Sequence, residues 1–109
     1  MDFYISKEEV VKSLNATLGV VEKRQTLPIL SNVLLEVDES SLKITATDLE
    51  SEISTTSTIS NFKSGGKTTA PARKLNDLCR LLPDLTEIHL FLDGDNLKIE
   101  TESGKYNIS

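Results

Sequence analysis

The segment between Pro71 and Pro83 predicts a short helix with well-defined ends. Proline suits the first position of a helix, where its missing N–H would have no partner, and Pro83 must stop the helix at or before Leu82. At about 100° per residue, apolar side chains gather on one face of this helix. They are Leu75, Leu78, Cys79 and Leu82. That face must pack against a core, so the rest of the chain has to supply one.

The other two sides of this helix carry polar and charged residues. Arg73 and Arg80 lie opposite the apolar face, with Asn76 and Asp77 beside them. A flank between the two faces carries Lys74 and Leu81. We expect both of these sides to be available for partners.

The length and composition of the chain favour one soluble globular domain. It has 109 residues, of which 38% are hydrophobic and 27% charged. No apolar run approaches the roughly 20 residues of a membrane span, and the N-terminus is no signal peptide. A single cysteine, Cys79, excludes an internal disulfide and gives no metal-binding cluster, so we expect a small core residue, a reducing cytoplasm and no cofactor.

Positive charge is concentrated in the two predicted helices, residues 7–24 and 71–83. They hold seven basic and four acidic residues, so their net charge is +3. The net charge of the whole chain is −5, so the remaining residues carry −8. The basic residues are Lys7, Lys12, Lys23, Arg24, Arg73, Lys74 and Arg80. An acidic protein with basic helices can attract phosphate on one side only. The alternative is an ordinary solvated face.

The first helix follows a short strand, residues 2–5. Ser6 and Glu9 have the spacing of a capping box. The apolar face of the helix is predicted to hold Val10, Val11, Leu14, Leu18 and Val21, and the opposite face Lys12, Ala16, Gly19 and Lys23. Small residues between two lysines would let a nucleic-acid backbone approach closely, or they form an undemanding solvent face.

Alternation of apolar residues predicts seven further strands. They cover residues 32–37, 42–46, 53–59, 67–70, 88–92, 97–99 and 105–109. The resulting order is strand, helix and three strands, repeated once, which predicts an α+β fold with both helices on one side of the sheets. The last strand reaches the end of the sequence without a stop signal, so we expect a fragment of a longer protein.

The sequence contains no clear catalytic constellation. His89 is the only histidine and is expected to have a surface or packing role. Asp48 and Glu50 could pair for acid–base or metal chemistry, although a turn-capping role suits Asp48 better. A small α+β enzyme or ligand-binding domain that uses Asp48, Glu50 and His89 is therefore the alternative function. The predicted helices carry no aromatic residues for base stacking, so any bound nucleic acid should be duplex and bound without sequence preference.

Four motifs resemble, in order and spacing, the first domain of the bacterial sliding clamp, the β subunit of DNA polymerase III. They are Thr26–Leu30 followed by Asn32, Thr47–Glu50, Pro71–Lys74 and Cys79–Pro83. The resemblance covers nearly one whole domain, starting at Met1. It implies a domain of two helices over antiparallel sheets.

The resemblance also implies a function. Two subunits of three domains each would join head to tail in a ring, whose helices line a hole for sliding duplex DNA. The ring tethers the polymerase and catalyses nothing. Domains two and three, which carry the site for the polymerase and the clamp loader, would be absent here.

The resemblance makes Arg24 and Arg73 DNA contacts. The helix faces add Arg80, Lys12 and Lys23 to this set. By the same resemblance, the interface with the second subunit would include Lys74, Leu81, Tyr106 and Ile108.

Overall fold

The computed structural model describes residues 1–23, 32–47 and 51–108 of the chain. In chain order the described elements are β1 (Asp2–Ser6), α1 (Lys7–Lys23), β2 (Asn32–Val37), β3 (Ser41–Thr47), β4 (Glu52–Thr58), β5 (Asn61–Ser64), β6 (Gly66–Pro71), α2 (Ala72–Arg80), β7 (Glu87–Asp93), β8 (Asn96–Thr101) and β9 (Gly104–Ile108). The predicted α+β class and the predicted order of elements are confirmed, with β5 as an additional strand.

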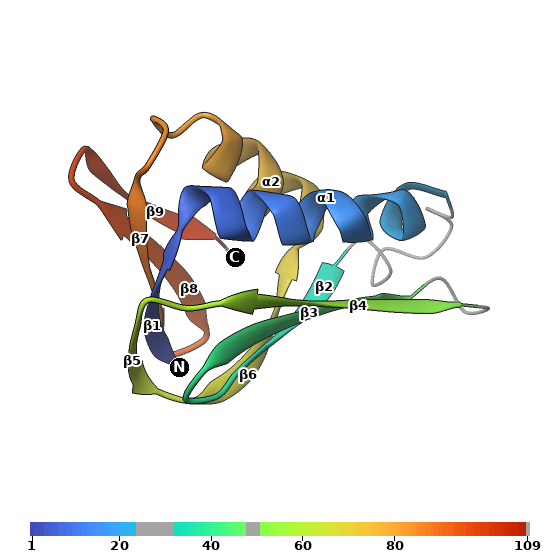
Figure 1. Cartoon of the computed structure of the whole chain (residues 1–109), viewed down its shortest axis with the longest axis horizontal. Helices are drawn as coiled ribbons and strands as arrows, with labels where there is room; N and C mark the ends of the chain where they lie inside the picture. Colours follow the sequence, from blue (N-terminus) through green and yellow to red (C-terminus); the bar gives the residue numbers. More distant parts are fainter. Residues whose placement is uncertain (24–31, 48–50, 109) are drawn as a thin grey trace.

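The strands form two antiparallel sheets with the two helices packed on them (Figure 1). The β1 sheet has the order β5-β1-β7-β8-β9, and the β2 sheet has the order β4-β3-β2-β6. Alternate residues of the central strands point into one shared core. The largest buried side chains from the strands are Phe3, Ile5, Val33, Leu35, Leu42, Ile44, Ile88, Leu90 and Ile99.

Helix α1 begins where Ser6 supplies a cap. The Ser6 Oγ accepts a hydrogen bond from the Glu9 N–H at 3.2 Å, which is one half of the predicted capping box. Val10 and Leu14 are fully buried, and the helix packs on β3 and β4. Lys12 and Ala16 lie on the exposed side, as the periodicity predicts.

Helix α2 packs beside α1 (Figure 1). Pro71 precedes it in an extended conformation, and the helix ends at Arg80, two residues before the predicted limit. The Leu81 N–H bonds back to the Leu78 carbonyl and the Leu82 N–H to the Cys79 carbonyl, which tightens the last turn.

The buried face of α2 differs from the predicted face at three positions, Ala72, Asn76 and Leu78. Ala72, Leu75, Asn76 and Cys79 are buried, whereas Leu78 is only half-buried. The prediction that Asn76 lies beside the arginines on the outer side was wrong. The buried positions follow the helical spacing i, i+3, i+4 and i+7, and Asn76 occupies i+4. The polar side chain of Asn76 suggested exposure, but its position on the helix places it on the buried face.

No helix within the described ranges is long and apolar enough to cross a membrane.

Candidate nucleic-acid interface

Three of the predicted DNA-binding residues are exposed on the two neighbouring helices. Arg73 and Arg80 lie on α2 and Lys12 on α1. Arg73 and Arg80 are seven residues apart, which places them on the same side of α2 and about 10 Å apart along its axis. Such cations can reach phosphates without reading bases.

Two other predicted contacts cannot be located on this surface. Lys23 is the last residue of α1, and its side chain is not among those described. Arg24 lies outside the described residues altogether. Their assignment as DNA contacts stays a prediction.

Lys7, which was counted with the basic helical residues, has a structural role instead. Its Nζ donates to the Leu82 carbonyl at 2.6 Å and pairs with Asp84 at 3.3 Å. The Lys7 side chain is only 14% exposed. Its backbone N–H also donates to the Thr86 carbonyl at 2.9 Å. Lys7 therefore ties the start of α1 to the loop after α2, and helps to hold the two helices side by side.

The residues predicted for the subunit interface lie in two environments. Lys74 is exposed on the outer side of α2, and Leu81, directly after the helix, is 85% exposed. Tyr106 is half-buried and Ile108 is buried in the core. Both belong to β9, which is an edge strand of the β1 sheet. Its outer backbone groups could pair with another strand.

His89 lies on β7, on the outer face of the β1 sheet. Its Nε2 is 2.7 Å from the Asp2 Oδ1, and its ring stacks between Tyr4 and Phe91 at centroid distances of 4.4 and 4.6 Å. The expected packing role is confirmed by these contacts. Asp48 and Glu50, its partners in the alternative enzyme hypothesis, lie outside the described residues.

Cys79 is poorly suited to chemistry. It is fully buried on α2, and burial raises the pKa of its thiol to about 12, against a smaller opposing effect of the Lys7 ammonium. The reactive thiolate is therefore scarce near neutral pH. Among the described side chains, no group of three or more His, Cys, Asp or Glu residues could hold a metal ion.

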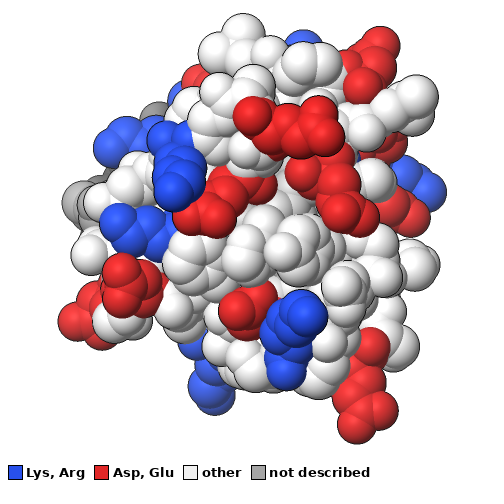
Figure 2. Space-filling view, turned by 90° about the vertical axis from the view of Figure 1, so that its left-hand side faces the viewer, with Lys and Arg blue, Asp and Glu red and all other residues white. Residues whose placement is uncertain are grey.

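Charge is unevenly distributed over the molecule. Figure 2 shows the side on which the β1 sheet lies, where acidic side chains gather over the centre and upper part and basic ones mainly at the left. This agrees with the acidic balance expected outside the helices.

A family model described as the N-terminal domain of the DNA polymerase III beta subunit matches residues 1–109. The chain is 41% identical to the beta sliding clamp of Proteus mirabilis and 39% identical to that of Pseudomonas aeruginosa, over 109 residues in each case. Both alignments cover 100% of this chain but only 30% of the relative.

Solved structures agree with these matches. The DNA polymerase III subunit beta from Pseudomonas aeruginosa superimposes with a TM-score of 0.93 at 38% identity, over 100% of this chain and 29% of that chain. Pol III beta from Caulobacter crescentus gives a TM-score of 0.92 at 35% identity, over 99% of this chain and 29% of that chain. The architecture of two helices on two antiparallel sheets is thus shared with these proteins.

Proposed function

Because the chain belongs to the family of the N-terminal domain of the DNA polymerase III β subunit, we propose that it forms one segment of a sliding clamp. Such a clamp encircles duplex DNA and keeps the replicative polymerase on its template. It is a non-catalytic processivity factor that needs no cofactor. It would act in the bacterial cytoplasm, on the nucleoid during replication.

The observation that carries this proposal is the pair of neighbouring helices with exposed basic residues. Arg73, Arg80 and Lys12 face solvent in a chain whose net charge is −5. Cations on flexible side chains attract phosphates weakly and without sequence preference, and this attraction falls with salt. Tight base contacts would hold a clamp in one place, whereas phosphate contacts of this kind permit sliding. We include Lys23 and Arg24 in the same surface.

We further propose that a second subunit binds at the β9 edge and the adjoining side of α2. The residues of this interface would be Lys74, Leu81, Tyr106 and Ile108. The outer edge of β9 could continue the β1 sheet into the partner, and Leu81 would lose its exposed apolar surface there. Ile108 would act indirectly, because it anchors β9 to the core.

The polymerase and the clamp loader are proposed to bind elsewhere. The chain spans 30% of the length of the Proteus mirabilis and Pseudomonas aeruginosa relatives. We propose that two further domains complete the ring and provide that binding site.

The decisive experiment uses the complete gene product and a clamp loader on nicked circular DNA. After loading, the circle is cut once with a restriction enzyme. A clamp retained by topology stays on the circle and leaves only after the cut. Retention on the linear DNA, or failure to load, would contradict the proposal.

The role of the helices can be tested by the salt dependence of DNA binding. The double variant R73A/R80A should reduce the slope of log K against log salt by about 1.8, because each phosphate contact contributes about 0.9. The matched control K63A/K67A removes two exposed cations from strands β5 and β6 and should leave the slope unchanged. Equal slopes for both variants would show that the helices are not the DNA surface.

A further inference from the structure

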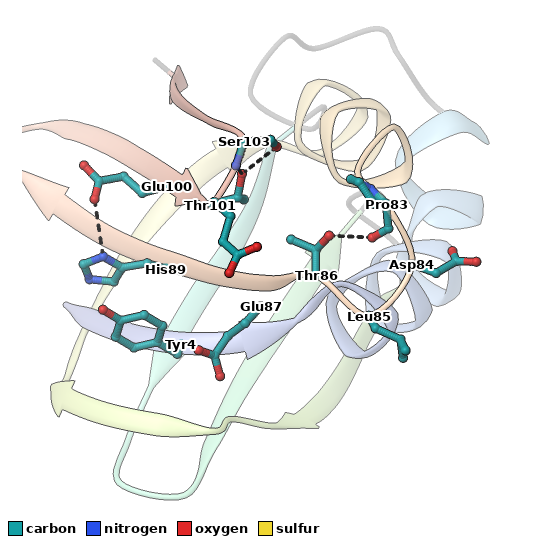
Figure 3. A pocket seen from close by; sticks show the side chains of 11 residues that line it. Tyr4, Pro83, Asp84, Leu85, Thr86, Glu87, His89, Glu100, Thr101 and Ser103 are labelled. Atoms are coloured by element: carbon teal, nitrogen blue, oxygen red, sulfur yellow. Dashed lines mark hydrogen bonds and ion pairs between the residues drawn. The ribbon is translucent and has the colours of Figure 1, made fainter.

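A groove lies on the outer face of the β1 sheet (Figure 3). It has a volume of about 610 Å³ and runs between the loop that follows α2 and the turn between β8 and β9 (Figure 3). This volume is in the range of a ligand or peptide site. None of the residues proposed for the DNA surface or for the subunit interface lines this groove.

The groove is strongly acidic. Four carboxylates line it: Asp84, Glu87, Glu100 and Glu102. Of these, Asp84 is paired with Lys7, and Glu100 lies 3.7 Å from the Nδ1 of His89. Lys105 faces Glu100 across the β8–β9 pair, without an ion pair between them among the described contacts. Two of the four carboxylates, Glu87 and Glu102, therefore have no cation partner among the described contacts.

An exposed leucine stands at the rim of this groove. Leu85 is 87% exposed, and Figure 3 shows its side chain pointing outward from the loop. Its φ of 65° lies in the left-handed region, which a leucine rarely adopts. Contacts from α1 hold this loop. Besides the Lys7 side chain, the Glu8 Oε2 accepts a hydrogen bond from the Leu85 N–H at 3.1 Å, and the Lys7 N–H donates to the Thr86 carbonyl. The apolar side chain is thus presented to solvent from a fixed backbone.

These features together define the occupant. A single metal ion does not fit, because no three acidic side chains in the described ranges come close enough to ligate one. Nucleic acid does not fit, because its phosphates would be repelled. A chain that carries several separate positive charges and an apolar residue is complementary to the spread carboxylates and to Leu85. We propose that this groove docks a lysine- or arginine-rich segment of a partner protein, with an apolar side chain of that segment packed against Leu85.

The test uses the complete gene product and a fluorescein-labelled peptide of about twelve residues built from Lys-Lys-Leu repeats. A peptide with Glu in place of each Lys serves as the charge control. Fluorescence anisotropy at low salt measures the affinity, and hydrogen exchange locates the bound peptide. We expect binding of the lysine peptide alone, with protection in residues 84–87 and 100–103.

Two matched variants distinguish binding in the groove from nonspecific attraction to an acidic protein. E100Q/E102Q should weaken binding of the lysine peptide about tenfold, as expected for the loss of two partly exposed charge contacts. E39Q/E52Q removes the same charge from exposed positions outside the groove and should leave the affinity unchanged. Equal weakening by both variants, equal binding of the glutamate peptide, or protection elsewhere would overturn the proposal.

The role of Leu85 is tested by Leu85→Gly. Glycine adopts the left-handed conformation without strain, so this variant should raise the Tm while it weakens peptide binding several-fold. Opposite changes in stability and affinity exclude unfolding as the cause of weaker binding. An unchanged affinity would overturn the apolar half of the proposal. Protection of the groove that rises with protein concentration, without peptide, would identify a second copy as the occupant and overturn the proposal as a whole.

Discussion

The two helices lie side by side in similar units of the fold, yet they contact the core through different chemistry. Helix α1 combines buried Val10 and Leu14 with two buried hydroxyl residues, Ser13 and Thr17. Helix α2 presents Ala72, Leu75 and Cys79 and one polar residue, Asn76. The two helices differ most in the hydrogen bonding of these buried polar groups. The Ser13 and Thr17 hydroxyls make hydrogen bonds, whereas the Asn76 Oδ1 has no hydrogen-bond partner among the described atoms.

The contact of α1 with β4 shows what the hydroxyls do. The Oγ of Ser13 is hydrogen-bonded to the Oγ of Ser57, and the Ser57 Oγ is also within reach of the Glu9 carbonyl at 3.3 Å. From the same strand, the Thr55 Oγ1 donates to the Ser13 carbonyl at 3.4 Å. Hydrogen bonds have preferred directions, so these bonds fix the position of α1 along β4 in a way that apolar contact alone does not. A repeated architecture therefore does not require repeated packing chemistry.

The largest loss of stability is expected when a buried leucine is truncated, and this loss should be similar for the two helices. Leu14→Ala and Leu75→Ala each remove a fully buried leucine. Each should lower the free energy of unfolding by about 3–4 kcal/mol, through lost burial and a residual cavity. Urea denaturation of both variants measures this. A loss below about 1 kcal/mol for only one of them would show that the two helices also differ in their apolar packing.

The next effect should appear for α1 only. Ser57→Ala leaves the buried Ser13 hydroxyl without its partner on β4, and should cost about 1–2 kcal/mol of unfolding free energy. The double variant S13A/S57A removes both hydroxyls and should cost less than the sum of the two single changes. Ser54→Ala is the control, because its hydroxyl pairs with Thr45 on the exposed face of β4. A strictly additive double variant would argue against a coupled pair.

In α2, removal of the buried polar side chain should stabilise the protein, whereas in α1 it should destabilise it. Asn76→Leu replaces a 3% exposed side chain, whose Oδ1 has no described partner, by an apolar side chain with the same number of heavy atoms and the same branching. We expect the free energy of unfolding to rise by about 1 kcal/mol, because the cost of a buried unsatisfied acceptor disappears. The same change at exposed Asn15 of α1 should stay within about 0.5 kcal/mol. A lower Tm for the Asn76 variant would contradict this interpretation.

The smallest effect concerns the second hydroxyl of α1. Thr17 is fully buried, but its Oγ1 donates within its own helix, to the Leu14 carbonyl at 2.9 Å. Thr17→Val keeps the shape and removes a bond that does not join α1 to the sheet. The free energy of unfolding, measured by thermal denaturation, should therefore change by no more than about 0.5 kcal/mol. A loss as large as that of Ser57→Ala would show that buried hydroxyls matter whatever their partner.

The sequence predicted the elements with strong periodicity and failed where tertiary contacts decide. The family resemblance, the α+β class, both helices and the other strands are confirmed. Strand β5, Asn61–Ser64, was missed because only Phe62 packs on the core, so the segment shows no alternation. The contacts of Lys7 could not be foreseen, since its partners Leu82 and Asp84 are more than 70 residues away in sequence.

The candidate site, like the fold, could be predicted from the sequence only in part. The exposure of Arg73, Arg80 and Lys12 followed from helical periodicity. The acidic groove could not be recognised in the sequence, because its residues come from β1, β7, β8 and two turns that are brought together only by the fold.

The place of β1 in its sheet has a consequence for synthesis of the protein. The first strand of the chain lies between β5 and β7 and pairs along its length with β7, for example Tyr4 with His89. On the ribosome, β1 therefore has to wait for more than 80 further residues before its main partner emerges. Contacts between such distant segments slow folding. We expect this domain to fold late and as a single cooperative unit, with β1 vulnerable to aggregation or chaperone capture until then.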